Sequence, residues 1–207
     1  FQGWSENSSG MPGTAAPDGS FGFALTAGDF NGDNYTDLAI GAPGKPINSQ
    51  ELAGEVTILY GSAGGLSTDG SQVWNQDSYG IPDNSESGDY FGAALAASDF
   101  DDDGYADLAI GAPLEDLEDK GAADAGWVGI IYGSANGLTA ARAQGWTQDS
   151  EGMPGEAESD DNFGRSLAAG DFNDDHRFDL AIGAPFEDTN DNKVEEAGWV
   201  GVIYGAP

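Results

Sequence analysis

Three short segments of the chain carry acidic and amide side chains at alternate positions. The segments are Asp29–Asp37, Asp99–Asp107 and Asp171–Asp179, and each has oxygen-bearing side chains at its first, third, fifth and ninth positions. Calcium takes six to eight hard oxygen ligands in a flexible geometry, and alternate residues of a tight loop can direct their oxygens at one centre. The pattern therefore predicts one calcium ion per segment, three per chain.

The expected ligand set is the same in each loop. Position 7 contributes its backbone carbonyl in this pattern, which assigns that role to Tyr35, Tyr105 and Arg177. A polar hairpin turn held by Asx hydrogen bonds uses similar residues and is the competing interpretation. Without a cation the crowded carboxylates would repel one another, so we expect the metal to support folding. The side-chain ligands are Asp29, Asn31, Asp33 and Asp37; Asp99, Asp101, Asp103 and Asp107; and Asp171, Asn173, Asp175 and Asp179.

The sixth position of each loop must turn sharply, often through positive φ. It is filled by Asn34, Gly104 and His176, which are residue types that tolerate left-handed geometry. We therefore interpret the single histidine as a turn residue and not as a general base, and we expect the third loop to be the most strained. The twelfth position is isoleucine in all three loops, where an EF-hand would carry a bidentate glutamate, and no flanking helices are predicted.

The elements that hold these loops recur along the chain. Phe21-Gly22, Phe91-Gly92 and Phe163-Gly164 are 70 and 72 residues apart, and each is followed by an aspartate loop and then Asp-Leu-Ala-Ile-Gly-Ala-Pro. Each unit has four short segments rich in β-branched and aromatic residues, separated by turn residues, which predicts four strands. The chain is therefore expected to be all-β, with repeats at approximately 4–73, 74–145 and 146–207.

A four-stranded unit of this size cannot bury both of its faces alone. Three independent sandwich-like domains would each have too small a core, whereas units packed side by side share one. This favours a β-propeller in which 1–207 is a single domain of three blades. The tryptophans at 74, 127, 146 and 199 recur at matched positions, and we expect them to pack between blades, with a sugar-stacking platform as the alternative.

Phe-Gly followed by an aspartate-rich loop and Gly-Ala-Pro, three times with the same spacing, resembles the FG-GAP repeats of the integrin alpha-subunit propeller and its bacterial relatives. The resemblance covers nearly the whole chain. It implies that each aspartate loop binds calcium in the hairpin between the first and second strands of a blade. It also implies a role in adhesion or protein recognition, although the partner subunit and inserted domain of integrins are not visible in this sequence.

The two ends of the chain are offset within the repeat. The segment at Trp4 matches the fourth strand of a unit, and the chain stops after a third-strand segment, which gives twelve expected strands. The Trp4 segment is therefore expected to complete the blade around 197–204 as a non-covalent clasp. Three blades cannot comfortably close a ring, but two chains can make six blades, so we expect a homodimer, with a fragment of a longer array as the alternative.

Composition excludes several functions. The net charge of −31 opposes binding to nucleic acid or to an anionic membrane surface, and no run of 18 apolar residues predicts membrane insertion. The absence of cysteine removes disulfides, thiolate metal sites and cysteine nucleophiles. No catalytic constellation or cofactor-binding motif is found, so we expect a protein that is not an enzyme. The start lacks an initiator Met and a signal-peptide pattern, which we interpret as a mature form or an excised piece.

The function that these observations favour is an extracellular or cell-surface binding module, because free calcium is high enough there to fill sites of modest affinity. An unknown protein is the expected ligand; a carbohydrate-binding propeller, or a non-catalytic structural module of a larger secreted protein, are the alternatives. The acidic segments 114–120 and 186–191 should lie on the face opposite the calcium loops, as a partner surface or as solvated loops. A second acidic set, 86–89 and 158–161, is interpreted as capping the start of the first strand, and no metal is assigned to it.

Overall fold

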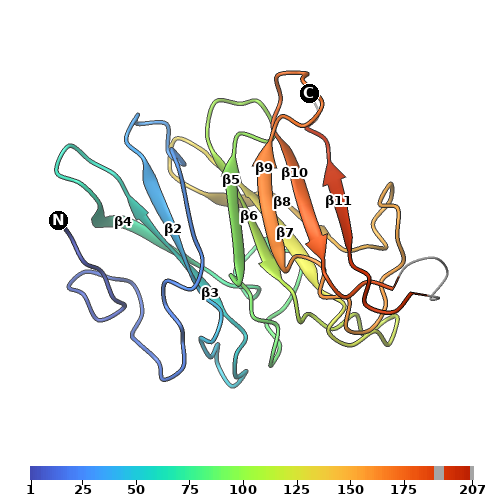
Figure 1. Cartoon of the computed structure of the whole chain (residues 1–207). Helices are drawn as coiled ribbons and strands as arrows, with labels where there is room; N and C mark the ends of the chain where they lie inside the picture. Colours follow the sequence, from blue (N-terminus) through green and yellow to red (C-terminus); the bar gives the residue numbers. More distant parts are fainter. Residues whose placement is uncertain (189–193, 206–207) are drawn as a thin grey trace.

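The chain forms three antiparallel sheets that stand side by side (Figure 1). The computed structural model describes residues 1–188 and 194–205, so the acidic segment 186–191 is described only as far as Asp188. Within these residues no helix is long and apolar enough to cross a bilayer. The strands of blade 1 are β1 (Leu25–Gly28), β2 (Asp37–Ala42), β3 (Glu55–Tyr60) and β4 (Ser67–Trp74); those of blade 2 are β5 (Ala94–Ser98), β6 (Asp107–Ala112), β7 (Trp127–Tyr132) and β8 (Thr139–Trp146); and those of blade 3 are β9 (Ser166–Gly170), β10 (Asp179–Ala184) and β11 (Trp199–Ile203).

Each sheet is a meander in which consecutive strands pair, and the three innermost strands β1, β5 and β9 lie next to one another (Figure 1). This confirms the all-β class and the arrangement of repeats as adjacent blades. The twelfth expected strand is not formed in the described chain. The segment around Trp4 belongs to no sheet and lies beside blade 1, far from β11, because the strand with which it would pair is at the other end of the molecule.

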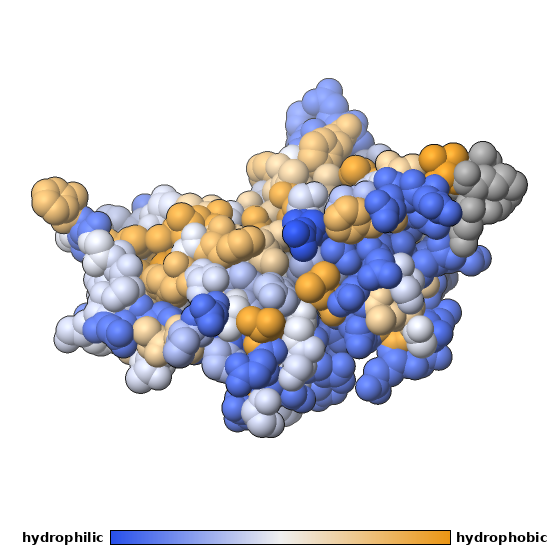
Figure 2. All heavy atoms as spheres, turned by 60° about the horizontal axis from the view of Figure 1, so that its bottom comes forward, coloured by the Kyte–Doolittle hydropathy of each residue, from blue (hydrophilic) through white to orange (hydrophobic). Residues whose placement is uncertain are grey.

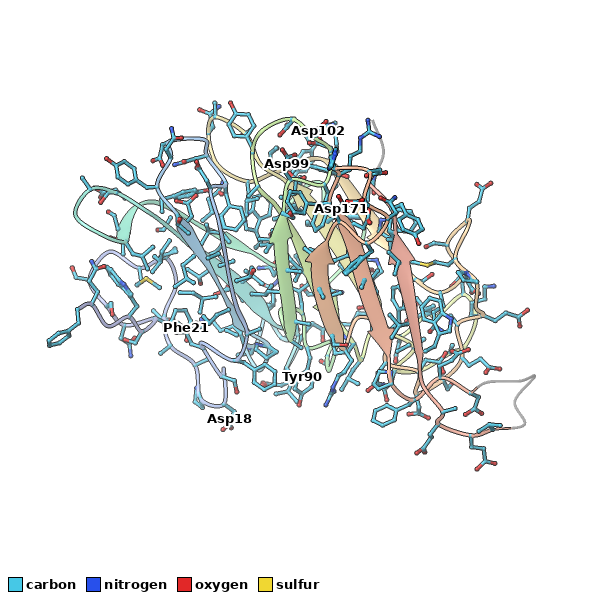
Figure 3. All side chains as sticks on the ribbon, turned by 45° about the horizontal axis from the view of Figure 1, so that its top comes forward. Asp18, Phe21, Tyr90, Asp99, Asp102 and Asp171 are labelled. Carbon is cyan, nitrogen blue, oxygen red and sulfur yellow. The ribbon has the colours of Figure 1, made fainter. Side chains whose placement is uncertain are left out.

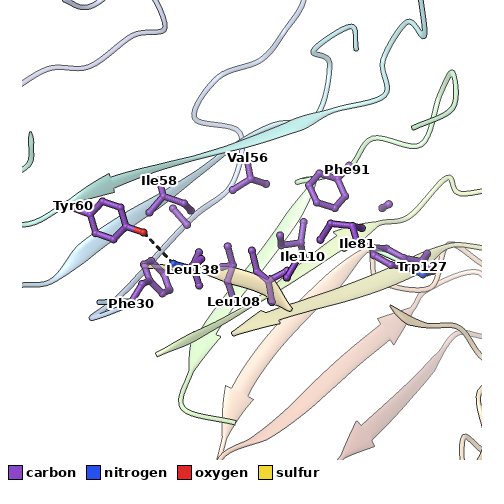
Figure 4. Close-up of a cluster of buried hydrophobic side chains, with 14 residues drawn as sticks. Phe30, Val56, Ile58, Tyr60, Ile81, Phe91, Leu108, Ile110, Trp127 and Leu138 are labelled. Atoms are coloured by element: carbon purple, nitrogen blue, oxygen red, sulfur yellow. Dashed lines mark hydrogen bonds between the residues drawn. The ribbon is translucent and has the colours of Figure 1, made fainter. Parts of the chain in front are cut away.

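The core lies between the blades. One cluster joins blades 1 and 2 through Ile58, Phe91, Leu108 and Trp127 (Figure 4), and a matching cluster joins blades 2 and 3. Phe91 and Trp127 have ring centroids 6.4 Å apart, and Phe163 and Trp199 repeat the contact at 6.3 Å. The tryptophans at 74, 127, 146 and 199 all belong to these clusters or pack against them, which confirms their expected role in packing between blades.

Glycine is required where neighbouring blades meet. A Cβ on Gly41 would lie 2.1 Å from the carbonyl oxygen of Gly92 in the next blade, and one on Gly111 would lie 2.2 Å from that of Gly164. Backbone cannot yield as a flexible side chain can, so a side chain at these positions would separate the blades. The Gly-Ala-Pro motif is therefore explained by close approach of backbones.

The first and last blades each leave one face uncovered. Phe23 and Leu25 on the blade 1 side are 67% and 59% exposed, and Val200 and Tyr204 on blade 3 are 68% and 57% exposed. Figure 2, in which the end of the molecule opposite the aspartate loops is turned forward, shows apolar side chains gathered towards blade 1 and hydrophilic ones towards blade 3. The faces between blades are largely buried, while the two terminal faces present apolar surface of the kind that a further blade would cover.

Candidate metal centres

The three aspartate loops are the hairpins that join β1 to β2, β5 to β6 and β9 to β10, at one end of the sheets. Figure 3 shows Asp99, Asp102 and Asp171 together at this end, with Asp18 and Tyr90 at the opposite end. The acidic segment 114–120 follows β6 and therefore lies at the end opposite the β5–β6 hairpin, as expected. Repetition of the blade thus brings the three loops to one rim.

The first aspartate of each loop organises the turn by accepting backbone hydrogen bonds. Asp29 Oδ1 accepts from the N–H groups of Gly32 and Asp33 at 2.7 and 3.1 Å, and its Oδ2 accepts from Asn34 at 2.8 Å. Asp99 and Asp171 receive the matching bonds from the fifth and sixth residues of their loops. These bonds fold each loop around the carboxylate of its first aspartate.

The sixth position has positive φ in every loop, as the sequence indicated: 66° at Asn34, 92° at Gly104 and 71° at His176. The fourth position does too, which the sequence analysis missed. It is Gly32 in the first loop but Asp102 and Asp174, with φ of 58° and 61°, in the others. The third loop has Asp174 at the fourth position and His176 at the sixth, and neither residue type adopts positive φ as readily as Gly or Asn. Each of the other two loops has glycine at one of these positions, so the third loop carries the most backbone strain.

The ninth-position aspartate is buried and holds the hairpin onto its sheet. Asp107 is fully buried; its Oδ2 accepts from the Phe100 N–H at 2.8 Å and its Oδ1 from the Gly133 N–H at 2.9 Å. Burial raises the pKa of Asp107 to about 7, because these two hydrogen bonds only partly offset desolvation and because Asp101 and Asp103 repel its charge. Asp37 and Asp179 make the same pair of bonds in their blades.

The second loop brings three predicted ligands together most closely. Carboxylate oxygens of Asp99, Asp101 and Asp107 all lie within 4.8 Å of one another. Asp101 also accepts a hydrogen bond from the Arg142 guanidinium at 2.6 Å. Three carboxylates around one point, with one of them buried, fit a calcium-like cation.

In the first and third loops the predicted metal-ligating side chains are arranged differently from those of the second loop. Asn31 and Asn173 donate from Nδ2 to the fifth-position carboxylates of Asp33 and Asp175, at 3.2 and 2.9 Å. In the third loop the groups that converge are Asp171, Asp174 and His176, of which only Asp171 was a predicted ligand. Tyr35, Tyr105 and Arg177 donate their N–H groups to the fifth-position aspartates of their loops. Their carbonyls as ligands, and the full ligand set, stay predictions.

A second group of carboxylates gathers at the opposite end of blade 2. The sequence analysis assigned 86–89 a capping role and placed Glu115 in a segment expected to be a partner surface or a solvated loop. Oxygens of Glu86, Asp89 and Glu115 lie within 4.8 Å of one another. Glu115 comes two residues after the Gly-Ala-Pro motif and is repeated as Glu187, whereas blade 1 has Lys45 at this position. This change from lysine to glutamate between repeats is the sequence feature that could have pointed to the second carboxylate group.

Comparison with known proteins agrees with the repeats. The FG-GAP repeat family matches residues 21–59, 91–129 and 163–200, together more than half of the chain. Phosphatidylinositol-glycan-specific phospholipase D of Homo sapiens is 32% identical over 194 residues, 92% of this chain and 21% of that protein. Integrin alpha-PS2 of Drosophila melanogaster is 32% identical over 92% of this chain and 12% of its own length, and integrin alpha-7 of Rattus norvegicus is 34% identical over 79% and 12%. The chain spans about a fifth or less of the length of these relatives.

Proposed function

The chain belongs to the FG-GAP repeat family, and from that premise we propose that it is a calcium-stabilised, non-catalytic propeller module that binds a macromolecular partner outside the cell. The observation that carries the proposal is the convergence of Asp99, Asp101 and Asp107 on one point of the second loop. The similarity to integrin alpha subunits supports a role in recognition. No phospholipase activity is transferred from the other relatives, because the chain corresponds to only a fifth of their length.

Calcium in the aspartate loops is the part of this proposal that is tested first. Native mass spectrometry from a calcium buffer should show ions that are removed by a chelator, and the chelator should lower the melting temperature by many degrees. Asp103→Ala should remove one ion and leave the other loops filled, because its carboxylate serves only the second loop. A melting temperature that is the same with and without chelator would refute calcium stabilisation.

We further propose that two chains close a six-bladed ring. Gln72, in the outer strand β4 of blade 1, forms two hydrogen bonds with the backbone of Leu138 in blade 2. Its Nε2 donates to the Leu138 carbonyl and its Oε1 accepts from the Leu138 N–H, both at 3.0 Å. Gln2 makes the same pair of bonds to Leu66 of blade 1, at 2.9 and 3.0 Å. The segment before Trp4 therefore lies where the outer strand of a preceding blade would lie.

The preceding blade in this proposal is blade 3 of a second copy. In blade 2, Val128 pairs with Trp146, and the same register would pair Val200 of the second copy with Trp4. The exposed apolar faces of blades 1 and 3 would be buried by the same step. Native mass spectrometry should give the mass of two chains, and Val200→Lys should give one; a wild-type monomer at high concentration would contradict the proposal.

A carbohydrate-binding propeller is the second candidate, on one specific observation. A cavity of about 390 Å³ between blades 2 and 3 is lined by aromatic and charged side chains, including Tyr132, Arg142 and Trp146. At the equivalent place between blades 1 and 2, Leu138 binds Tyr60 (Figure 4) and also Gln72, so the crevice there is occupied by protein. Protein recognition is therefore favoured over sugar binding. Specific binding on a glycan array that Trp146→Ala abolishes would reverse that order.

A further inference from the structure

The carboxylate cluster of blade 2 at the end opposite the aspartate loops is deeply buried. Asp89 and Glu115 are 2% and 3% exposed, and Glu86 is half-buried beside them. Asp89 comes just before the labelled Tyr90 in Figure 3, at the far end of the sheets from Asp99. Carboxylates are very rarely buried together unless a positive charge or shared protons balance them. No lysine or arginine ion pair is found to this cluster in the described chain.

A buried amide reaches into the same cluster. Gln76 is 1% exposed, and its Nε2 donates to Glu115 Oε2 at 2.6 Å. The Oε1 atom of this carboxamide is buried and has no hydrogen-bond partner within residues 1–188 and 194–205. A buried amide oxygen without a partner is costly, and next to carboxylates a cation is the partner that would satisfy it.

Blade 3 repeats the arrangement. Gln148 is fully buried, donates from Nε2 to Glu187 Oε2 at 2.5 Å, and leaves its own Oε1 buried without a partner among the residues that the structure describes. Asp161, 2% exposed, accepts the Glu158 N–H at 2.6 Å, as Asp89 accepts that of Glu86 at 2.5 Å. Two blades thus place a glutamine amide and buried carboxylates in the same relation.

Blade 1 carries a fixed positive charge at this place. Lys45 stands where the others have glutamate, and its Nζ forms an ion pair with Glu6, lies 3.6 Å from Glu55 Oε1 and donates to the Thr14 carbonyl. Glu6 takes the place of Gln76, while the positions of Glu86 and Asp89 are taken by Ala16 and Gly19. Where lysine is present the two further acids are missing, which is the exchange expected if this end of a blade requires a cation.

We propose that blades 2 and 3 each bind a hard divalent cation of the calcium class at this end, held by Glu86, Asp89, Glu115 and Gln76 in blade 2 and by their counterparts in blade 3. Carboxylate and amide oxygens are ligands that calcium takes in proteins. The ion occupies the place of the Lys45 ammonium in blade 1. It ties the connection between two blades to the loop after the second strand, so the molecule carries a second layer of cations opposite the aspartate loops.

The electrostatics of the cluster agree with this assignment. Burial, together with the nearby charges of Asp83 and Asp89, raises the pKa of Glu115 to about 9. Burial likewise raises the pKa of Asp89 to about 7. The cluster therefore holds either protons or a metal ion at neutral pH, and a bound divalent cation favours the ionised carboxylates.

Native mass spectrometry with calcium tests the proposal on the whole chain. Wild type should carry five ions per chain, the doubly substituted Asp89→Asn, Glu115→Gln protein should carry four, and Asp103→Asn, a matched change in an aspartate loop, should also carry four. An ion count that Asp89→Asn, Glu115→Gln leaves unchanged would overturn the second site while the loop sites stand. Loss of an ion in that protein but not in Asp103→Asn would support the second site and reject the loop site.

Glu115→Lys provides a second test in case the Asp89→Asn, Glu115→Gln protein folds poorly. It supplies the charge that Lys45 supplies in blade 1, so the variant should carry one ion fewer than wild type and should melt in chelator at or above the wild-type temperature. A Glu115→Lys protein that still carries the wild-type number of ions would refute the proposal. So would one that melts well below wild type in chelator, because the site would then not accept a positive charge.

Discussion

Blades 1 and 2 are alike at one end and opposite in charge at the other. Their aspartate loops share the turn, and Asp37 and Asp107 fix them to the sheet by the same two hydrogen bonds. At the far end, blade 1 has a buried lysine among glutamates, while blade 2 has buried carboxylates and an amide. The difference shows that one fold can meet a local need for positive charge with a side chain or, as we propose, with a bound ion.

The largest expected effect on stability comes from removing the buried ammonium group of Lys45. Lys45→Met would leave Glu6 and Glu55 buried without a partner, and breaking a buried pair in this way costs about 3–5 kcal/mol of unfolding free energy. Denaturant unfolding measures the loss. Lys120→Met is the matched control, since Lys120 is an exposed lysine paired with Asp149 and its loss should change stability far less. Equal small effects would show that blade 1 does not need the charge.

Two matched substitutions test whether the aspartate loops of blades 1 and 2 are equivalent. Asp37→Asn and Asp107→Asn each replace one accepting oxygen by an N–H donor that faces a buried backbone N–H, at a cost of about 1–3 kcal/mol. Because the two aspartates make the same bonds, the losses measured by thermal unfolding should agree within error. A large loss in only one blade would contradict the equivalence of the two loops.

When metal is absent, the stability of the wild type should depend on pH through the buried Glu115 carboxyl. The folded pKa of Glu115, about 9, lies above its ordinary value of 4.5, so its contribution to stability is full below pH 4.5 and is lost as the pH rises towards 9. In chelator the melting temperature of wild type should therefore fall from pH 5 to pH 9. The fall should be smaller in Glu115→Gln, and calcium should reduce it in wild type. An equal fall in both proteins would exclude Glu115 as its source.

The smallest expected effect compares two tyrosines at the same strand position. The Tyr60 O–H donates to Gln72 Oε1 at 2.5 Å and accepts the Leu138 N–H at 3.2 Å, so Tyr60→Phe should cost about 1 kcal/mol. The hydroxyl of Tyr132 has no such bond in the described part of the chain, and its ring keeps the Arg142 guanidinium at 4.8 Å either way. Tyr132→Phe should therefore be close to neutral in monomer unfolding; a loss as large as that of Tyr60→Phe would show that the crevice beside it is occupied in solution.

Local spacing was sufficient to predict the repeats, the strand pattern and the turn at the sixth loop position, because each depends on residues within a few positions of one another. Asn34 and Gly104 illustrate this, since a left-handed turn selects its residue type directly. The role of Asp107 was predicted only in part. Its bond to Gly133 joins residues 26 apart, and loop spacing alone does not reveal a contact between two hairpins.

The sequence by itself determined an acidic, all-β chain of three FG-GAP repeats, each with an oxygen-rich hairpin, since repeated motifs and alternating donors are readable along the chain. Tertiary structure decided which donors share a site. It moved the Trp4 segment beside blade 1, and it brought Gln76 and Asp89, from the connection between β4 and β5, together with Glu115, from the connection between β6 and β7. Burial and charge balance are properties of that assembled environment, so they emerge only when segments distant in sequence meet.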